Sequence, residues 1–241
     1  QLDKGEKSVG IGLNAGYYAT GSYNTFVGSE AGKGGTTSAP YSSGQFNVAM
    51  GFEALGNFTT GYQNVTVGSS AGNDITTGIR NTIIGANAGD AITTTSGVVL
   101  IGYNAGGAIN HSDASYTVAI GQSAGAAITS AVGSVLLGYA AGLSLTEGDG
   151  NTLIGRETGD ALTTGHENVA VGRNALTSNQ TGQRSVAIGN SALNNSTTDG
   201  WTKNTAVGHA ALGSIGSTAG NTGIGYYAGY QSVLGVENTL V

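Results

Sequence analysis

The pattern N-x-x-x-G-x-x-A recurs along the whole chain and places a marker glycine once in every repeat. Eight of the twelve steps between successive marker glycines are 17 residues. A constant period of this length predicts a stack of repeats, in which each unit packs on its neighbours and cannot fold alone. The marker glycines are Gly12, Gly28, Gly51, Gly68, Gly85, Gly102, Gly121, Gly138, Gly155, Gly172, Gly189, Gly208 and Gly225.

The residues just before each marker glycine predict one short β-strand per repeat. The residue one before it is always aliphatic or Met, and the residue three before it is always Val or Thr, as in Val48 and Met50. These two positions share one face of a strand, because side chains alternate with period two. β-Branched residues favour that pleated surface.

The residue two before the marker glycine is also apolar in most repeats, so both faces of the strand are expected to be buried. A coil of about 17 residues can cover only one face of its own strand, so the second face needs another layer. Further copies of the chain are the simplest such layer, and a sheet folded back on itself is the alternative. The strand residues expected to face the other subunits of a trimer are Ala49, Ile83, Leu100, Leu136, Leu153 and Ala170.

Two further positions describe the rest of the coil. Alanine stands three after the marker glycine in every repeat except at Thr158, which indicates a site too tight for a larger side chain. A large apolar residue such as Phe58, Ile75 or Leu162 often stands seven after the glycine. This position predicts a second strand that closes the coil.

Asparagine is the commonest residue four before the marker glycine. Stacked coils would align these side chains in a ladder, in which each one hydrogen-bonds the backbone at a bend. A row of ligand-binding asparagines is the alternative interpretation. The ladder residues are Asn24, Asn47, Asn64, Asn81, Asn151, Asn168, Asn204 and Asn221.

Composition excludes several classes of function. The net charge of −6 is spread thinly over 241 residues without a basic patch, which argues against binding of nucleic acid. No apolar run is long enough for membrane insertion by this segment. The absence of cysteine excludes thiol chemistry and is compatible with a surface or secreted protein. The chain starts and stops within the pattern, so it is expected to be a segment of a longer protein.

We expect no catalytic site, no metal site and no cofactor, and hence no enzyme. The three histidines, His111, His166 and His209, stand at different phases of the repeat and would not stack into one site. The acidic residues are scattered, without the Asp in every turn of calcium-binding repeats and without a marked acid–base pair. No phosphate-binding Gly-x-x-x-x-Gly-Lys-Ser/Thr motif is present.

Residues 1–241 are expected to form one repeat domain with irregular insertions near 33–46, 107–116 and 194–203. Binding residues concentrate on loops that a rigid scaffold holds, so the insertions are the candidate receptor-binding regions. An aromatic ring beside polar groups suits a sugar, whereas packing on coil edges or on a neighbouring chain is the alternative role. The candidate receptor-binding residues are Tyr41, His111, Tyr116, Trp201 and Lys203.

Several runs resemble known surface fibres. The runs 47–51 (NVAMG), 168–172 (NVAVG) and 185–189 (SVAIG) resemble the head repeats of trimeric autotransporter adhesins of the Yersinia adhesin type. The run 204–208 (NTAVG) is similar to repeats of phage tail fibres and related bacterial surface fibres. The resemblance covers essentially the whole chain. It implies an all-β, left-handed parallel β-roll or solenoid of about thirteen coils, assembled as a homotrimeric fibre.

The function expected from this resemblance is non-enzymatic attachment. The fibre segment would be extracellular, on a cell surface or in a virion tail fibre, and would recognise a glycan or protein receptor on a host or prey cell. A passive spacer in such a fibre is the main alternative. An ice-binding solenoid with aligned threonines and an acyltransferase of the left-handed β-helix kind are weaker alternatives, because the Thr-Thr-Gly turns fall at bends and no strict hexapeptide period is present.

Overall fold

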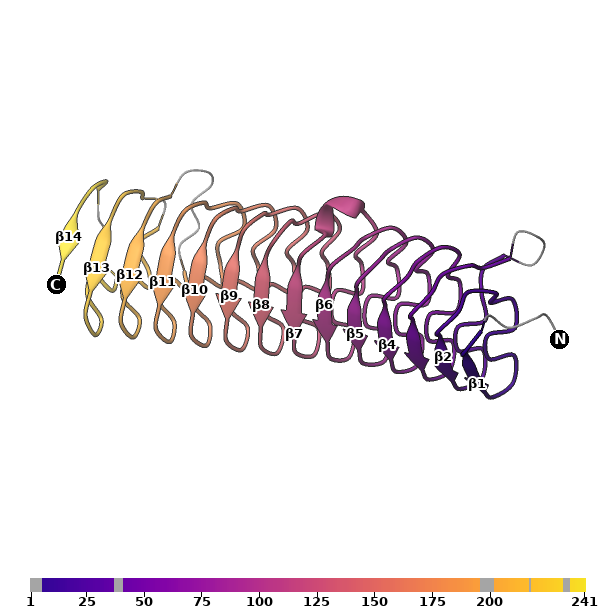
Figure 1. The fold of residues 1–241 in the computed structure, drawn as a ribbon. Helices are drawn as coiled ribbons and strands as arrows, with labels where there is room; N and C mark the ends of the chain where they lie inside the picture. The colour runs from indigo at the N-terminus through magenta and orange to yellow at the C-terminus, as the bar shows by residue number, and fades with distance from the viewer. Residues whose placement is uncertain (1–5, 37–40, 196–201, 217, 232–234) are drawn as a thin grey trace. The chain divides into compact units, whose positions relative to one another are not determined.

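The computed structural model describes residues 6–36, 41–195, 202–216, 218–231 and 235–241. By its internal contacts the chain divides into two compact units, Gln1–Thr117 and Val118–Val241. Each unit is a β-solenoid in which one coil contributes one strand to a parallel sheet (Figure 1). The described residues include no α-helix, and a single 3-10 turn, η1 (Ser112–Ala114), interrupts the coils of the first unit.

The strands are short and end directly before the marker glycines, as the sequence predicts. In the first unit they are β1 (Val9–Ile11), β2 (Thr25–Val27), β3 (Val48–Met50), β4 (Val65–Val67), β5 (Thr82–Ile84) and β6 (Val99–Ile101). In the second unit they are β7 (Val118–Ile120), β8 (Val135–Leu137), β9 (Thr152–Ile154), β10 (Val169–Val171), β11 (Val186–Ile188), β12 (Thr205–Val207), β13 (Thr222–Ile224) and β14 (Thr239–Leu240).

Equivalent positions of successive coils pair in register. Between β3 and β4, for example, Val48 pairs with Val65 and Met50 pairs with Val67. Between β9 and β10, Leu153 pairs with Ala170 in the same way. Neighbouring parallel strands lie about 4.8 Å apart, so each side chain of one coil stands directly beside its counterpart in the next.

The strand residues that were expected to face other subunits point into the coil instead. The middle strand residue points into the coil of its own chain, and its neighbours on either side point outward. The six residues that were expected to face other subunits are each 0% exposed within the single chain: Ala49, Ile83, Leu100, Leu136, Leu153 and Ala170. That assignment was wrong, because period-two alternation shows which residues share a face but not which face lies inside.

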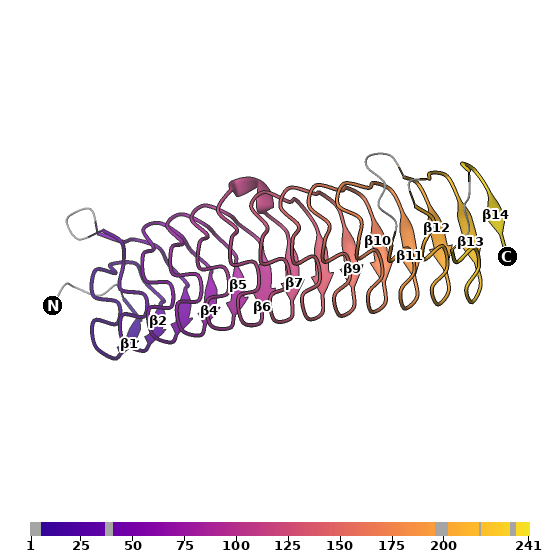
Figure 2. The same cartoon turned by 180° about the vertical axis from the view of Figure 1, so that it is seen from behind.

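The expected second strand is absent from the described residues. The large residues seven after the marker glycine, such as Phe58, Ile75 and Leu162, are 0% exposed and fill the core. However, the segment that carries them forms turns, which the view from behind shows opposite the sheet (Figure 2). Residues two and four after the marker glycine have positive φ, as at Asn87 (55°) and Gly89 (51°), so the chain bends twice just before the expected strand.

The sizes of two core side chains are complementary in many coils. The two positions are the middle strand residue and the residue four after the marker glycine. Coils with a large middle strand residue carry glycine four after the marker, and a Cβ at Gly89 would lie 2.8 Å from Leu100 Cδ1. Several coils with alanine in the strand carry leucine at the later position, as in the pairs Ala49 with Leu55 and Ala170 with Leu176, all fully buried. In these coils one of the two positions holds the large side chain and the other a small one, as close packing of a protein core requires.

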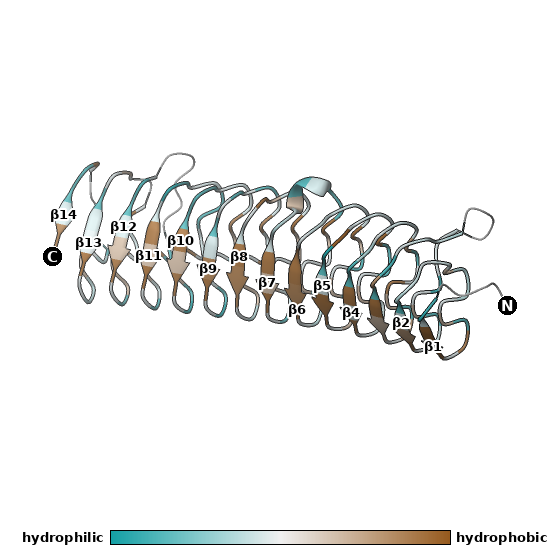
Figure 3. Ribbon diagram, viewed as in Figure 1, coloured by the Kyte–Doolittle hydropathy of each residue, from teal (hydrophilic) through white to brown (hydrophobic). Residues whose placement is uncertain are grey.

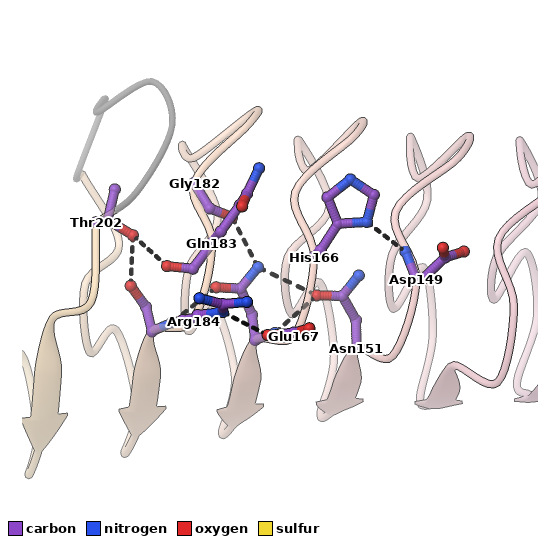
Figure 4. Close-up of polar contacts among 10 residues, drawn as sticks. Asp149, Asn151, His166, Glu167, Gly182, Gln183, Arg184 and Thr202 are labelled. Atoms are coloured by element: carbon purple, nitrogen blue, oxygen red, sulfur yellow. Dashed lines mark hydrogen bonds and ion pairs between the residues drawn. The ribbon is translucent and has the colours of Figure 1, made fainter.

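The asparagine ladder is present inside the bend before those strands that an asparagine precedes. Asn64 Oδ1 accepts a hydrogen bond from the backbone N–H of Asn81 at 3.1 Å, and Asn64 Nδ2 donates to the carbonyl of Gly78 at 2.9 Å. Asn151 and Asn168 repeat this pattern in the second unit (Figure 4). The ladder side chains are buried, so their role is to bond backbone groups that water cannot reach.

Candidate functional site

The first insertion places Tyr41 against another tyrosine. The ring of Tyr41 is half-buried and stacks on Tyr18, with centroids 6.4 Å apart and planes 11° apart. Tyr18 in turn packs edge-to-face with Tyr17, with ring centroids 4.7 Å apart. Tyr41 therefore packs on aromatic rings of its own unit.

The second insertion exposes Tyr116 and gives His111 a local partner. His111 stands before η1, where its Nδ1 accepts a hydrogen bond from the backbone N–H of Asp113 at 3.3 Å. The imidazole also lies 3.2 Å from the Asp113 carboxylate. Tyr116 is 73% exposed, and its ring lies over Gly97, where an added Cβ would be 3.0 Å from Tyr116 Cδ1.

The five predicted receptor-binding residues do not form one site. Tyr41 lies between β2 and β3, whereas His111 and Tyr116 follow β6, so four strands of the first unit separate them. Lys203 is exposed in the second unit, before β12, and its backbone N–H donates to the carbonyl of Gln183 at 3.2 Å. Trp201 lies outside the described residues.

A row of exposed side chains, to which the predicted Tyr116 and Lys203 belong, lies along each unit five residues before the marker glycines. All of its described members have positive φ, and we call it the edge row: Lys7, Tyr23, Phe46, Gln63, Arg80 and Tyr116 in the first unit, and Glu167, Arg184 and Lys203 in the second, with glycine at 97, 133, 150 and 220. Neighbouring members interact between coils. Tyr23 and Phe46 stack with centroids 4.9 Å apart and planes 2° apart.

The charged members of the edge row form ion pairs instead. Arg184 Nε donates to Glu167 Oε2 from the adjacent coil (Figure 4). This contact lowers the pKa of the Glu167 carboxyl, because the hydrogen bond and the charge of Arg184 stabilise the carboxylate. Both side chains are about half exposed, so this ion pair of the edge row is in contact with water.

A groove lies beside the aromatic part of the edge row. It has a volume of about 340 Å³ and lies in the turns that precede β3 and β4; its lining residues are Ser43, Gly44, Gln45, Phe46, Thr60, Tyr62 and Gln63. Four of these belong to the first insertion, but Tyr41 is not among them. Sequence reasoning missed Phe46 and Tyr62. The available signal for Phe46 was an aromatic residue at a position that several other coils fill with glycine or a charged residue.

The outward face of the sheet is a mainly aliphatic strip in each unit, with threonine at the first position of six strands. We define the strip as the first and third residues of every strand, all of which are Val, Thr, Ile, Leu or Met. Most strands therefore carry hydrophobic residues (Figure 3). Val48, Met50 and Ile84 in the first unit, and Val169, Ile188 and Ile224 in the second, are among its most exposed members.

Two partly buried aspartates lie on the far side of the coils. Burial raises the pKa of the Asp90 carboxyl, and the nearby Asp74 adds repulsion, although the backbone N–H groups of Asp90 and Ala91 oppose the shift. Burial also raises the pKa of Asp160, with a smaller contribution from Glu157. No group of three metal-ligating His, Cys, Asp or Glu residues occurs within the described ranges.

These shifts predict how stability depends on pH. A carboxyl whose folded pKa lies above its unfolded value of 3.8 contributes its stabilisation fully below pH 3.8 and loses it as the pH rises through the folded pKa. The substitution Asp90→Asn is therefore expected to raise stability at pH 7, by less than about 1 kcal/mol because solvent screens a partly exposed group. Thermal unfolding at pH 7 and pH 3 checks this, and a gain that is larger at pH 3 would contradict it.

Comparison with known proteins gives no family for this chain. A scan of models of protein families matches none, and neither the curated proteins nor the solved structures contain a significant match. Among the residues that the structure describes, no helix has the length and apolar character needed to cross a membrane.

Proposed function

We propose that this chain is a non-enzymatic segment of a homotrimeric surface fibre that attaches to a receptor on another cell. The observation that carries the proposal is the aliphatic strip. A soluble chain seldom leaves a contiguous apolar patch of this kind in water, and such patches mark interaction surfaces. The strip carries no charged residue in any strand.

A second copy of the same chain is the occupant that fits the strip best. The exposed side chains repeat at the spacing of the strands, about 4.8 Å. A copy of this chain presents the same spacing over the same number of coils, so aliphatic side chains can interdigitate along the entire face. An unrelated globular partner would match only a few coils. The resemblance to adhesin heads favours three copies rather than two.

The histidines support a non-enzymatic role, because each has a structural partner. His111 bonds to Asp113 next to η1, and His166 Nδ1 accepts from the backbone N–H of Asp149 at 2.9 Å (Figure 4). His209 stacks on Tyr226, with centroids 5.2 Å apart. The threonine hydroxyls of the turns are also engaged, as in the 3.1 Å bond from Thr76 to the carbonyl of Thr93, which disfavours ice binding through these turns.

Substitution within the strip tests assembly. Ile84→Lys places a charge in the centre of the proposed interface, where an unpaired buried charge costs more than about 3 kcal/mol. Light scattering on a size-exclusion column is expected to give three times the 23.7 kDa chain mass for the wild type and the chain mass for the variant. Val132→Lys is the matched control, because Val132 is 39% exposed, Ile84 is 38% exposed, and Val132 lies outside the strip.

A monomeric wild type would overturn the proposed assembly and leave the aliphatic strip free. Thermal hysteresis would then test whether the solenoid binds ice. Attachment itself is tested by the binding of the labelled trimer to intact cells. If a full-length fibre still binds after these coils are removed, the segment is a spacer and the receptor-binding part of the proposal is wrong.

A further inference from the structure

The groove in front of β3 and β4 has the composition of a sugar-binding site. Its lining includes two exposed aromatic rings, Phe46 and Tyr62, which are 51% and 37% exposed. Its polar groups are the amides of Gln45 and Gln63 and the hydroxyls of Ser43 and Thr60. None of the lining side chains is a carboxylate, ammonium or guanidinium. The groove therefore offers stacking surfaces and uncharged donors and acceptors together.

Backbone hydrogen bonds hold the two coils of the groove in place. The N–H of Gln63 donates to the carbonyl of Gln45 at 3.0 Å, and the N–H of Gly44 donates to the carbonyl of Thr59 at 3.1 Å. Arg80 Nε also donates to Gln63 Oε1 at 3.3 Å. Because these contacts exist without a ligand, binding would cost little ordering of the site.

The ring of Phe46 belongs to a larger flat aromatic surface. Phe46 stacks on Tyr23, and the Lys7 ammonium lies 5.3 Å from the centroid of the Tyr23 ring. Both rings are substantially exposed, so the stack buries only part of its apolar area. Phe46 also lines the groove, so this aromatic surface and the groove share one ring.

Backbone conformation indicates that the fold does not require these rings. Phe46 and Tyr23 have φ of 57° and 62°, whereas Gly133 and Gly150 occupy the same row with φ of 61° and 63°. A bulky residue at positive φ costs about 1 kcal/mol or more relative to glycine. The stack offsets part of this cost, but it leaves about half of each side chain exposed. A ligand that stacks on them accounts for their presence.

From these observations we infer that the groove binds a neutral oligosaccharide. A sugar ring has an apolar C–H face that stacks on an aromatic ring, and its hydroxyls pair with amide and hydroxyl groups. The volume of about 340 Å³ is at the lower end of the range for small-molecule sites, about 300–1,000 Å³, so it accommodates a short glycan segment. This inference rests on the proposed attachment function and names the class of receptor. A trimer would present the groove three times and gain avidity.

Binding of the whole protein to an array of neutral, sialylated and sulfated oligosaccharides tests the inference. We expect binding to neutral oligosaccharides, and a loss of about tenfold or more in Phe46→Ala and in Tyr62→Ala. Phe46→Tyr keeps the ring and is expected to bind like the wild type. Tyr103→Ala is the matched control, because Tyr103 is 55% exposed in the same unit and does not line the groove.

Three results would overturn the inference: no neutral glycan binds, charged glycans bind through the same residues, or Phe46→Ala and Tyr62→Ala both bind like the wild type. The mass of each variant in solution separates loss of binding from loss of assembly. If Phe46→Ala changes the mass of the assembly, the glycan binding of Tyr62→Ala is the result that tests the inference. Attachment to cells that persists after enzymatic removal of surface glycans would refute the glycan inference and leave the attachment proposal intact.

Discussion

Gly172→Ala is expected to destabilise the second unit by about 4 kcal/mol or more. Gly172 directly follows β10 and has φ of 132°, a conformation that L-residues rarely adopt, and an added Cβ would lie 2.6 Å from the carbonyl oxygen of Gly189. The obstacle is backbone of the next coil, so no side chain can move aside to relieve the overlap. Urea denaturation followed by circular dichroism measures the loss.

Gly133→Ala is the control for this prediction. Gly133 also has positive φ, 61°, but an added Cβ would meet nothing within 4 Å. Only the conformational cost of about 1 kcal/mol applies there. If the two alanine variants lose equal stability, the close approach of successive marker glycines is not what fixes these residues.

Asn64→Ala is expected to lower the stability of the first unit by about 3 kcal/mol. The substitution removes the partners of two buried backbone groups, the N–H of Asn81 and the carbonyl of Gly78. A buried polar group that loses its partner costs about 1–3 kcal/mol. Differential scanning calorimetry of the variant and the wild type gives the difference.

Two variants calibrate the asparagine prediction. Asn64→Ser is expected to lose only about 1 kcal/mol, because Ser134 at the same ladder position donates to the carbonyl of Gly148 and accepts from the N–H of Asn151, both at 3.2 Å. Asn57→Ala changes an exposed asparagine and is expected to stay within about 0.5 kcal/mol of the wild type. A similar loss for Asn57→Ala and Asn64→Ala would show that the ladder has no special role.

The strands and their positions in the repeat could be predicted from the sequence, because β-branched or aliphatic residues alternate at a fixed distance before each marker glycine. The path of the chain between one strand and the next could not be predicted. Its bends use positive φ at Asn87 and even at Leu55, and leucine gives no sign of that conformation. The inward face could have been identified from the volume exchange between Ala49 and Leu55, which shows that these two residues fill one space.

The candidate site was predicted only in part. The first insertion does contribute Ser43, Gln45 and Phe46 to the groove, but the other wall comes from Tyr62 and Gln63 of a regular coil. A search for breaks in the repeat overlooks such residues, because the groove forms where an irregular coil meets a regular one. Tyr41 shows the converse: an insertion residue that stacks on Tyr18.

The in-register pairing of successive coils also bears on how such a chain folds. Val48 meets Val65, and Val65 meets Thr82, so each new strand joins the sheet after closing a loop of one repeat. The entropy of loop closure is then nearly the same for every coil, however many coils a unit contains. Folding can nucleate at one coil and propagate along the unit, and adding whole repeats lengthens the unit without raising the mean sequence separation of its contacts.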